Sequence, residues 1–316
     1  MQSKLTVIIV NYQSWGFLSK CIDSLLNQDS GILKIVVVDN FSNDGKIDSF
    51  RKKYSFVQWV QLNYNSGFSK ACNVGTNFVK TPWVLFLNPD SILPVDCLGS
   101  IVSFCERNNE LKLISIRMKN NFLNKPFPHG LYFNFWTVSN TIRQFYILFS
   151  KSKMRKKTID GKKVIFLGWI SGSFVLIRKK DFDSIGGWDE DYWMYGEDMD
   201  FCKRASEHNI QTCVLYDWFY YHAHGGSSRR NKDIELITKA ELISSKHIYI
   251  EKHLKGIEKK MTHYLLISTK FIELIFSAPF SKFYRVLLFN LLKYWKKSIK
   301  TKKWKSLYLQ QDSNFN

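Results

Sequence analysis

The sequence contains six cysteines, but no C-x-x-C pair and no other cysteine spacing typical of a metal site. This absence argues against a disulfide framework or a structural zinc site. Most of the cysteines fall on apolar faces, where free thiols pack as small hydrophobic groups. The chain also enters a strand pattern at once, without a charged and then apolar leader. Both observations indicate a reducing, cytoplasmic setting.

No internal repeat or low-complexity stretch is present, and no apolar run reaches the roughly 20 residues that a bilayer-spanning helix needs. The stretches 264–276 and 283–295 come nearest, but charged residues interrupt or flank them (Lys270, Glu273, Lys282 and Arg285). The chain is 45% hydrophobic and 16% aromatic, which excludes disorder as its general state. Its 316 residues can bury a core as one large domain, or as a domain with an extension.

The formal net charge of +19 is concentrated near the C-terminus. Residues 246–305 contain 15 Lys or Arg against three Glu, and a smaller basic run covers residues 151–157. Residues 231–316 are predicted to be helical only. We interpret them as helices in a membrane interface, with the apolar side down and the lysines toward anionic headgroups. The alternative is a helical bundle packed on the core.

Apolar, β-branched runs alternate with helical periodicity in the first part of the chain. Strands are predicted at residues 5–10, 35–38, 57–62, 84–87, 164–170, 173–178 and 211–216. Helices are predicted at residues 15–28, 44–53, 66–80, 98–105, 179–185 and 197–208. This alternation predicts an α/β fold with right-handed crossovers, a mostly parallel sheet and a nucleotide-binding half-domain over residues 1–95. Residues 150–163 are predicted to form a mobile loop.

Polar residues follow four of the predicted strands. They are Val10-Asn11-Tyr12, Asp39-Asn40, Asn65-Ser66-Gly67-Phe68 and Asn88-Pro89-Asp90. Parallel strands place these segments on one edge of the sheet, where α/β proteins bind ligands. Asp39 could accept hydrogen bonds from a base or ribose, and Gly67 would let backbone approach a ligand. Asp90 alone is either a turn residue or a ligand for a metal that holds phosphate.

A second polar cluster covers residues 186–200 and mixes six carboxylates with aromatic side chains. Such a mixture suits a sugar, whose apolar face stacks while its hydroxyls need acceptors. Glu197 and Asp198 open a predicted helix, where the helix dipole should keep them ionised. Capping charge alone is the alternative for Glu197. An ionised Asp beside a hydroxyl nucleophile is a suitable general base.

The segment His222-Ala223-His224 follows the last predicted strand, and two histidines at i and i+2 on a strand face opposite ways. At most one of them should point into the site. With Asp90 it could complete an oxygen and nitrogen shell for Mn²⁺ or Mg²⁺. Arg229 and Arg230 could meet phosphate.

The chain resembles family 2 glycosyltransferases of the inverting GT-A type, in particular the bacterial rhamnosyltransferase-like branch. The resemblance covers residues 5–228 and rests on blocks in the family's order: VIIVNYQS, IVVVDNFSND, NSGFSKACNVG, VLFLNPDS, WISGSFVLIRKKDFDSIGGWDEDYWMYGEDMDFCKR and HAHGGSS. It implies a GT-A fold over residues 1–230, divided into a nucleotide-binding half (1–95) and an acceptor half (96–230), with a helical extension over residues 231–316.

The resemblance also implies roles for single residues. Asp198 matches the catalytic base, with Glu197 beside it, and Asp90 matches the last Asp of the D-x-D metal motif, whose first position is Asn88 here. His222 matches the metal-side His, with His224 as the alternative. The implied nucleotide-sugar site comprises Val10, Asn11, Tyr12, Asp39, Asn65, Gly67, Phe68, Asn73, Asn88, Pro89 and Asp90. The implied acceptor site comprises Trp169, Ser171, Gly172, Trp188, Asp189 and Tyr195.

The implied partners are a dTDP- or UDP-linked sugar and a glycan carried on a polyprenyl diphosphate. The reaction would be a one-step displacement with inversion, assisted by a divalent cation, in surface polysaccharide synthesis on the inner face of the plasma membrane. A nucleotidyltransferase is the first alternative, although residues 10–14 lack its Gly-rich triphosphate loop. A basic protein that binds membrane or nucleic acid without catalysis is the second. The mixture of basic residues with long apolar helices favours lipid over nucleic acid.

Overall fold

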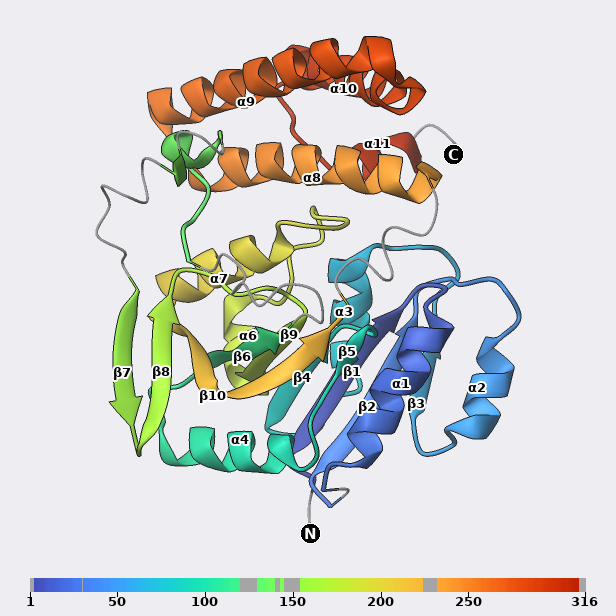
Figure 1. Ribbon diagram of the computed structural model, residues 1–316, viewed down its shortest axis with the longest axis vertical. Coiled ribbons are helices and arrows are strands. Elements are labelled where there is room, and N and C mark those ends of the chain that lie inside the picture. The colour runs from blue at the N-terminus through green and yellow to red at the C-terminus, as the bar shows by residue number, and fades with distance from the viewer. Residues whose placement is uncertain are drawn as a thin grey trace. The chain divides into compact units, whose positions relative to one another are not determined.

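The computed structural model describes residues 3–29, 31–119, 130–139, 143–144, 154–223 and 232–312 (Figure 1). It divides into two compact units. Unit 1 comprises Met1–Gly130, Met154–Asp189 and Asp198–Ser227. Unit 2 comprises Leu131–Lys153, Glu190–Glu197 and Ser228–Asn316. Unit 2 also includes two segments that precede residue 230. The domain boundary expected at residue 230 therefore stays a prediction.

Unit 1 is built on a ten-stranded sheet in the order β3-β2-β1-β4-β9-β6-β10-β8-β7, with β5 paired to β10. The strands are β1 Leu5–Asn11, β2 Leu33–Asp39, β3 Gln58–Gln61, β4 Trp83–Leu87, β5 Ser91–Ile92, β6 Leu113–Lys119, β7 Arg155–Ile159, β8 Lys162–Leu167, β9 Phe174–Arg178 and β10 Thr212–His222. Strands β3, β2, β1 and β4 run parallel to one another, as predicted. Strand β9 pairs antiparallel with both β4 and β6, so the whole sheet is mixed, and the prediction of a mostly parallel sheet holds only for its first half.

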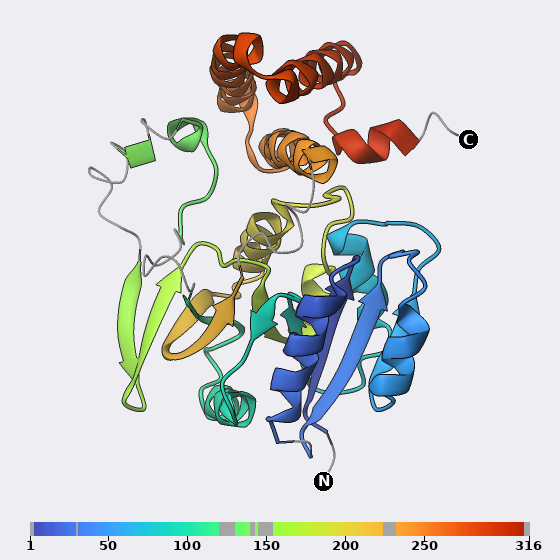
Figure 2. The same cartoon turned by 45° about the vertical axis from the view of Figure 1, so that its right-hand side comes forward.

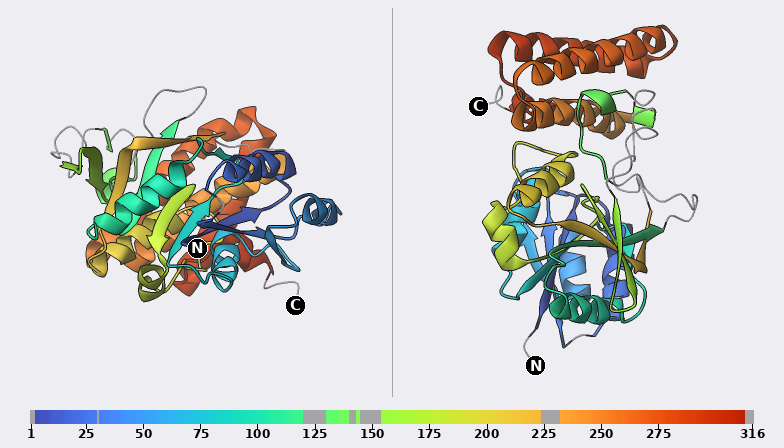
Figure 3. Two further views of the ribbon diagram at one scale, coloured as in Figure 1. Left: turned by 90° about the horizontal axis from the view of Figure 1, so that it is seen from below. Right: turned by 90° about the vertical axis from the view of Figure 1, so that its left-hand side faces the viewer.

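Helices cover both faces of this sheet (Figures 1 and 3). They are α1 Trp15–Leu26, α2 Ile47–Lys53, α3 Phe68–Thr76, α4 Cys97–Arg107, α6 Lys179–Ile185 and α7 Glu197–Glu207. Helices α1 and α4 share one core with the strand residues Val7, Ile9 and Leu85. On the other face α3 approaches closely, since a Cβ on Gly75 would lie 2.7 Å from Ile8 Cγ2. The expected α/β fold with a helix-flanked sheet is confirmed.

The predicted loop over residues 150–163 is wrong for residues 155–163, while residues 150–153 lie outside the described part of the chain. Strands β7 and β8 form an antiparallel hairpin, and β8 pairs with β10. The hairpin turns at Asp160 and Gly161, both with positive φ, a dipeptide typical of tight hairpin turns. The run of basic residues suggested a solvent-exposed loop. These residues lie instead on an exposed edge strand, where lysines discourage pairing with other chains.

Unit 2 is helical, as predicted (Figure 2). Its elements are η1 Phe135–Thr137, α8 Lys232–His253, α9 Gly256–Ser277, η2 Ala278–Phe280, α10 Lys282–Thr301 and α11 Leu307–Asp312. Its core brings together residues of α8, α9 and α10, among them Ile243, Leu274 and Leu291. None of the described helices is both long and apolar enough to cross a bilayer. The six cysteines, all in unit 1, are buried thiols rather than disulfides, as predicted.

Candidate functional site

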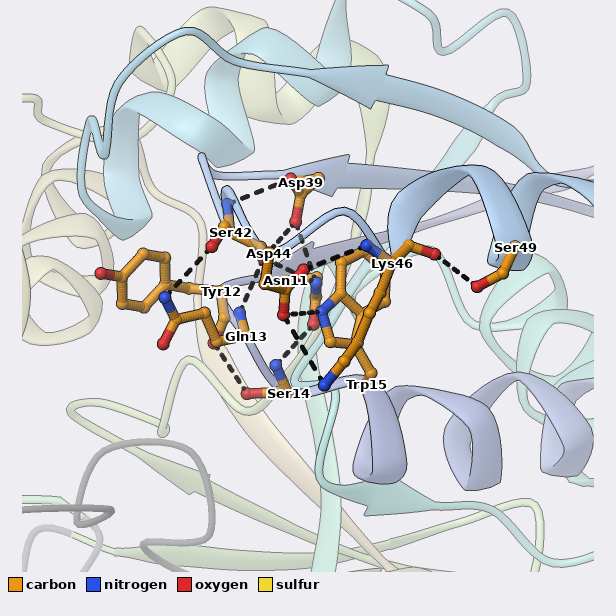
Figure 4. A network of polar contacts seen from close by, with 10 residues as sticks. All are labelled: Asn11, Tyr12, Gln13, Ser14, Trp15, Asp39, Ser42, Asp44, Lys46 and Ser49. Carbon is orange, nitrogen blue, oxygen red and sulfur yellow. Dashed lines mark hydrogen bonds and ion pairs between the residues drawn. The ribbon is translucent and has the colours of Figure 1, made fainter.

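The carboxyl ends of β1 and β2 hold a buried carboxylate in a fixed orientation (Figure 4). Asn11 and Asp39 are paired in the β1–β2 register, and Asn11 Nδ2 donates to Asp39 Oδ1 at 3.0 Å. The Ser42 N–H donates to Asp39 Oδ2 at 3.1 Å, and the Ser42 hydroxyl makes a short hydrogen bond to Asp39 Oδ1. A carboxylate has about four lone-pair sites, so Asp39 retains acceptor capacity for a ligand.

Ser42 joins the loop after β1 to the loop after β2. Its hydroxyl oxygen accepts the Gln13 N–H at 2.7 Å, and its carbonyl accepts from Gln13 Nε2 at 3.1 Å. Nearby, Trp15 Nε1 donates to Asp44 Oδ2 at 2.7 Å. The ring of Tyr12 projects away from these contacts (Figure 4). These hydrogen bonds hold the loop after β1 and the loop after β2 together beside Asp39.

Asn40 connects the end of β2 to the loop that precedes α3. Its Nδ2 donates to Asn65 Oδ1 at 2.9 Å and to the Gly67 carbonyl at 3.2 Å, while its Oδ1 accepts the Ser66 N–H at 2.9 Å. Gly67 has φ of 83°, which favours glycine, and it immediately precedes the first turn of α3. The three predicted strand ends at Asn11, Asp39 and Asn65 therefore lie on one edge of the sheet.

Asn73 and Trp188, both predicted to contact ligand, contact each other. Asn73 Nδ2 donates to the Trp188 carbonyl at 2.8 Å, and the Trp188 N–H donates to Asn73 Oδ1 at 3.0 Å. The Trp188 indole is only 2% exposed and packs against the rings of Phe68, Phe86 and Phe201. This burial contradicts the prediction that Trp188 stacks on a sugar, because its faces are already covered. We therefore assign Trp188 to the core.

Asp90 and His222 meet at the end of β4. The two-residue strand β5 follows Asp90 directly and pairs with the end of β10, so that Ser91 is opposite His222. His222 Nε2 lies 3.0 Å from Asp90 Oδ1 and 3.4 Å from Asn88 Nδ2. His222 is thus beside Asp90, while His224 lies outside the described residues.

Asp90 Oδ1 is buried and, within the described part of the chain, accepts no hydrogen bond of acceptable geometry despite the nearby imidazole. A buried carboxylate oxygen left in this state fits a cation ligand. Among the described residues, no three His, Cys, Asp or Glu side chains gather closely enough to hold a metal by themselves. Asp90 and His222 therefore fit a cation that takes its remaining ligands from a bound molecule.

Asp198 lies near the same end of β4. Strand β9 begins beside the end of β4, where the Asn88 N–H donates to the Ser173 carbonyl at 3.1 Å. The N–H of the preceding residue, Gly172, donates to Asp198 Oδ2 at 3.1 Å. Short covalent and hydrogen-bonded steps thus connect Asp90 to Asp198, which are far apart in sequence.

Tyr220 extends this connection toward His222. The hydroxyls of Ser173 and Tyr220 lie 2.6 Å apart, and the rings of Tyr220 and His222 are centred 6.2 Å apart on β10. Burial raises the pKa of the Tyr220 phenol well above its ordinary value, and the charge of Asp90 adds to this shift. The Tyr220 hydroxyl therefore stays neutral beside Ser173.

Asp198 lies in the first turn of α7, as predicted, but the expected effect on its pKa has the wrong sign. Burial raises the pKa of Asp198 from 3.8 to about 6, against the opposing effect of backbone N–H donors from Gly172 and Met199. Desolvation thus outweighs the dipole of the helix N-terminus. A carboxyl group with a pKa of about 6 is mostly ionised at neutral pH. Its carboxylate is a stronger base than that of an exposed Asp, and so a better acceptor for the proton of an alcohol.

The remaining predicted residues of unit 1 lie near these groups in sequence. Val10 and Pro89 are buried, whereas Phe68, Trp169, Ser171 and Asp189 are half-buried. Two predicted residues, Tyr195 and Glu197, belong to unit 2. Glu197 is buried at the first position of α7, and Tyr195 is half-buried with φ of 69°. The ligand roles of all these residues stay predictions.

Ser42, Ser173 and Tyr220 were not predicted as parts of the site, and Asn40 was predicted only as a polar residue at the end of the second strand. Ser42 stands three residues after Asp39, a spacing at which a hydroxyl or amide commonly bonds a preceding carboxylate. That spacing could have identified it. Tyr220 and Ser173 come together only through the pairing of distant strands, for which the sequence holds no local signal.

Comparison with known proteins identifies the family. Residues 6–186 match the family model "Glycosyl transferase family 2", and residues 167–224 match "N-terminal domain of galactosyltransferase". The chain is 30% identical over 217 residues to rhamnosyltransferase WbbL of Escherichia coli (strain K12), covering 63% of this chain and 76% of that protein. It is 24% identical over 232 residues to an N-acetylglucosaminyl-diphospho-decaprenol L-rhamnosyltransferase of Mycobacterium tuberculosis (strain CDC 1551 / Oshkosh), covering 66% and 72%.

Solved structures share the fold. The crystal structure of S. aureus TarS 1-349 in complex with UDP-GlcNAc aligns with a TM-score of 0.54 at 19% identity, over 91% of this chain and 79% of that chain. GalNAc-T7 with UDP, GalNAc and Mn²⁺ aligns with a TM-score of 0.57 at 14% identity, over 79% and 48%. These likenesses agree with the expected GT-A-type architecture.

Proposed function

Because the chain belongs to glycosyl transferase family 2, in its rhamnosyltransferase-like branch, we propose that it moves a sugar from a nucleotide-diphosphate donor to an acceptor hydroxyl with inversion. The carrying observation is that Asp39, Asp90 and Asp198 lie around the carboxyl ends of the parallel strands. Asn11 holds Asp39, and the Asn88–Ser173 and Gly172–Asp198 hydrogen bonds connect the segment of Asp90 to Asp198. We propose dTDP-rhamnose as the first donor to test and UDP-hexoses as the next.

The donor nucleotide would bind at the ends of β1, β2 and β3. Asp39 is held by Asn11 and Ser42 and keeps capacity to accept from a base or ribose group. The Asn40 amide holds the Asn65–Gly67 loop, where Gly67 leaves space for a ligand close to backbone. Pre-oriented groups of this kind lower the entropic cost of binding.

Asp90 and His222 would hold a Mn²⁺ or Mg²⁺ ion together with the donor diphosphate. The paired UDP and Mn²⁺ in the GalNAc-T7 structure supports this assignment by analogy of fold. Such an ion, when bound, neutralises negative charge on the diphosphate. Asn88 occupies the position before Pro89 and Asp90, so it adds a neutral side chain rather than a second carboxylate.

Asp198 would act as the base. As the acceptor oxygen forms its bond to the anomeric carbon, the bond from that carbon to the diphosphate breaks and the nucleoside diphosphate leaves. The hydroxyl proton passes to an oxygen of Asp198. Gly172 fixes the carboxylate by donating to Oδ2, and the raised pKa makes Asp198 a better proton acceptor than an ordinary Asp.

We propose a polyprenyl-diphosphate-linked glycan as the acceptor, with the reaction at the cytoplasmic face of the plasma membrane. The mycobacterial relative is an N-acetylglucosaminyl-diphospho-decaprenol L-rhamnosyltransferase, which supports this class of acceptor. We assign residues 1–230 to the catalytic domain and residues 231–316 to an extension. Family membership favours this proposal over a nucleotidyltransferase or a non-catalytic basic protein.

The test is a donor screen with the purified full chain and a short polyprenyl-diphosphate sugar acceptor. We expect release of dTDP or UDP with one nucleotide-sugar and a product whose anomeric configuration, measured by NMR, is opposite to that of the donor. Retention of configuration would contradict the one-step mechanism. Release of pyrophosphate from a nucleoside triphosphate and a sugar phosphate would support a nucleotidyltransferase instead.

A further inference from the structure

Helix α9 carries an apolar stripe on the side that faces solvent, interrupted by the exposed Ser268. Its members lie on one face of the helix, in two groups at residues 257–264 and 271–276. They are Ile257, Met261, Tyr264, Phe271, Ile272, Ile275 and Phe276, all exposed. The stripe continues at the turn to α10, where Phe276 is 73% exposed and Phe280 is 90% exposed.

The opposite side of α9 already forms the core of unit 2. His263, Leu266 and Leu274 are buried on that side, and Leu274 shares a cluster with residues of α8 and α10. The exposed stripe is therefore additional to the apolar surface that folds the unit. Large contiguous apolar surfaces on a folded chain generally mark a place where something binds.

Helix α10 gives this surface its charge. All the charged residues of α10 are basic, and the exposed ones alternate with exposed apolar side chains. The cations are Lys282, Arg285, Lys293, Lys296, Lys297 and Lys300, and the apolar residues are Val286, Phe289, Leu292 and Ile299. Lys293 Nζ lies 4.2 Å from the centre of the Phe289 ring. Helices α9 and α10 lie on the same side of α8 (Figures 1 and 2).

We propose that the exposed face of α9, η2 and α10, called here the hairpin face, docks on the surface of an anionic lipid bilayer. Apolar side chains enter such a surface between headgroups, while nearby cations attract anionic lipids. A second copy of this chain fits less well, because two like-charged α10 helices would be brought together. A nucleic acid would bind the lysines but would leave the exposed rings of Phe276 and Phe280 in water. The proposal rests on this surface and not on the chemistry of the sugar transfer.

Co-sedimentation of the full chain with vesicles tests the proposal. Phe276→Glu/Phe280→Glu removes the apolar tip, and both side chains are exposed, so the fold should persist. We expect recovery with phosphatidylcholine–phosphatidylglycerol vesicles to fall at least about tenfold. Lys293→Glu/Lys296→Glu/Lys297→Glu should lower recovery on these vesicles and weaken its dependence on salt. The matched controls in unit 1, Phe56→Glu/Val95→Glu and Lys20→Glu/Lys52→Glu, should sediment like the wild type.

Other outcomes would overturn the proposal. Undiminished sedimentation of the tip variant would do so. The proposal would also fail if the wild type were a dimer in light scattering, the tip variant were a monomer, and both bound vesicles equally. A wild type that prefers duplex DNA over anionic vesicles would contradict it as well. Hydrolysis of the donor in the absence of acceptor should be unchanged in both hairpin-face variants. A wild type that binds vesicles but transfers no sugar would refute the proposed function and leave this inference standing.

Discussion

Oδ2 of Asp198 accepts a hydrogen bond of 3.1 Å from the backbone N–H of Gly172. Gly172 precedes Ser173, whose carbonyl is bonded to Asn88 at the end of β4. The position of Asp198 therefore depends on the antiparallel insertion of β9 beside β4. This arrangement supports the proposal that a base and a metal-binding carboxylate serve one reaction.

Asp198→Asn should lower kcat by about 10²–10⁴-fold, because the amide keeps the contact to Gly172 but cannot take a proton. In the wild type, kcat/KM should rise with pH through about 6 and then level off, as the base becomes ionised. Initial rates of nucleoside diphosphate release measure both effects. Glu207→Gln, an exposed change on the same helix, is the control. A folded Asp198→Asn variant with near-normal turnover would contradict the assignment.

Asp90→Asn and His222→Ala should each weaken the binding of Mn²⁺ in the presence of nucleoside diphosphate by about tenfold or more, since the first removes the negative charge of the site and the second removes its imidazole ligand. Calorimetric titration of nucleoside diphosphate with and without Mn²⁺ measures the change. Asp48→Asn, an exposed carboxylate in α2, is the matched control. Equal metal affinity in the wild type and both variants would remove Asp90 and His222 from the proposed metal site.

Ser42→Ala should raise the KM for the donor by about tenfold with a smaller effect on kcat, because Asp39 loses a hydroxyl donor and Gln13 loses its acceptor. The free energy of unfolding should fall by about 1–3 kcal/mol. Steady-state kinetics and thermal melts provide the two readouts. Ser49→Ala is the control, because the Ser49 hydroxyl donates to the nearby Lys46 carbonyl at an exposed position (Figure 4). An unchanged donor KM would show that Asp39 does not depend on Ser42.

Much of this site could be predicted from the sequence, because its anchors follow buried strands. The runs before Asn11, Asp39 and Asn88 are apolar on both faces, so their parallel pairing sets those residues on one edge. Trp188 was misjudged because aromatic residues beside carboxylates look alike whether they face a sugar or a core. The place of β9 between β4 and β6 depends on long-range pairing, and it brings Ser173 to Tyr220 without any local pattern.

The loop that leads to Asp198 is anchored within unit 2. Trp193 stacks on Tyr308 of α11, with ring centres 4.1 Å apart. The Ser245 hydroxyl donates to the Met194 carbonyl at 3.0 Å, and Lys252 Nζ lies 2.6 Å from Asp191 Oδ2. Helices α8 and α11 thus hold residues 190–197, which include the predicted acceptor residue Tyr195.

Tyr308→Ala should therefore lower kcat/KM for the acceptor by about tenfold, since small displacements of a positioning loop are costly. The KM for the donor should change little, and Tyr308→Phe, which keeps the stacked ring, should behave like the wild type. Kinetics with each substrate varied in turn separates these effects. Equal losses in Tyr308→Ala and Tyr308→Phe would point to the hydroxyl rather than to the stack.

A chain of hydrogen bonds in unit 2 determines the tautomers of two buried histidines. Trp295 Nε1–H donates to His247 Nε2 at 3.1 Å, so neutral His247 carries its proton on Nδ1. That nitrogen lies 2.8 Å from His263 Nδ1, which must accept, and His263 Nε2–H then faces Glu251 Oε2 at 3.4 Å. Protonating either ring would set two N–H groups against each other.

Unit 2 should consequently lose stability in acid. Burial lowers the pKa of His263 from 6.5 to about 4, against the raising effect of Glu251. Because the folded-state pKa of this histidine is depressed, its contribution to stability is complete above about pH 6.5 and is lost progressively as the pH falls from 6.5 to about 4. His263→Gln should reduce this loss by about 1–3 kcal/mol, followed by tryptophan fluorescence in denaturant titrations at several pH values. His208→Gln, exposed in unit 1, should retain the full loss, and an identical pH profile in His263→Gln would assign the acid sensitivity to other groups.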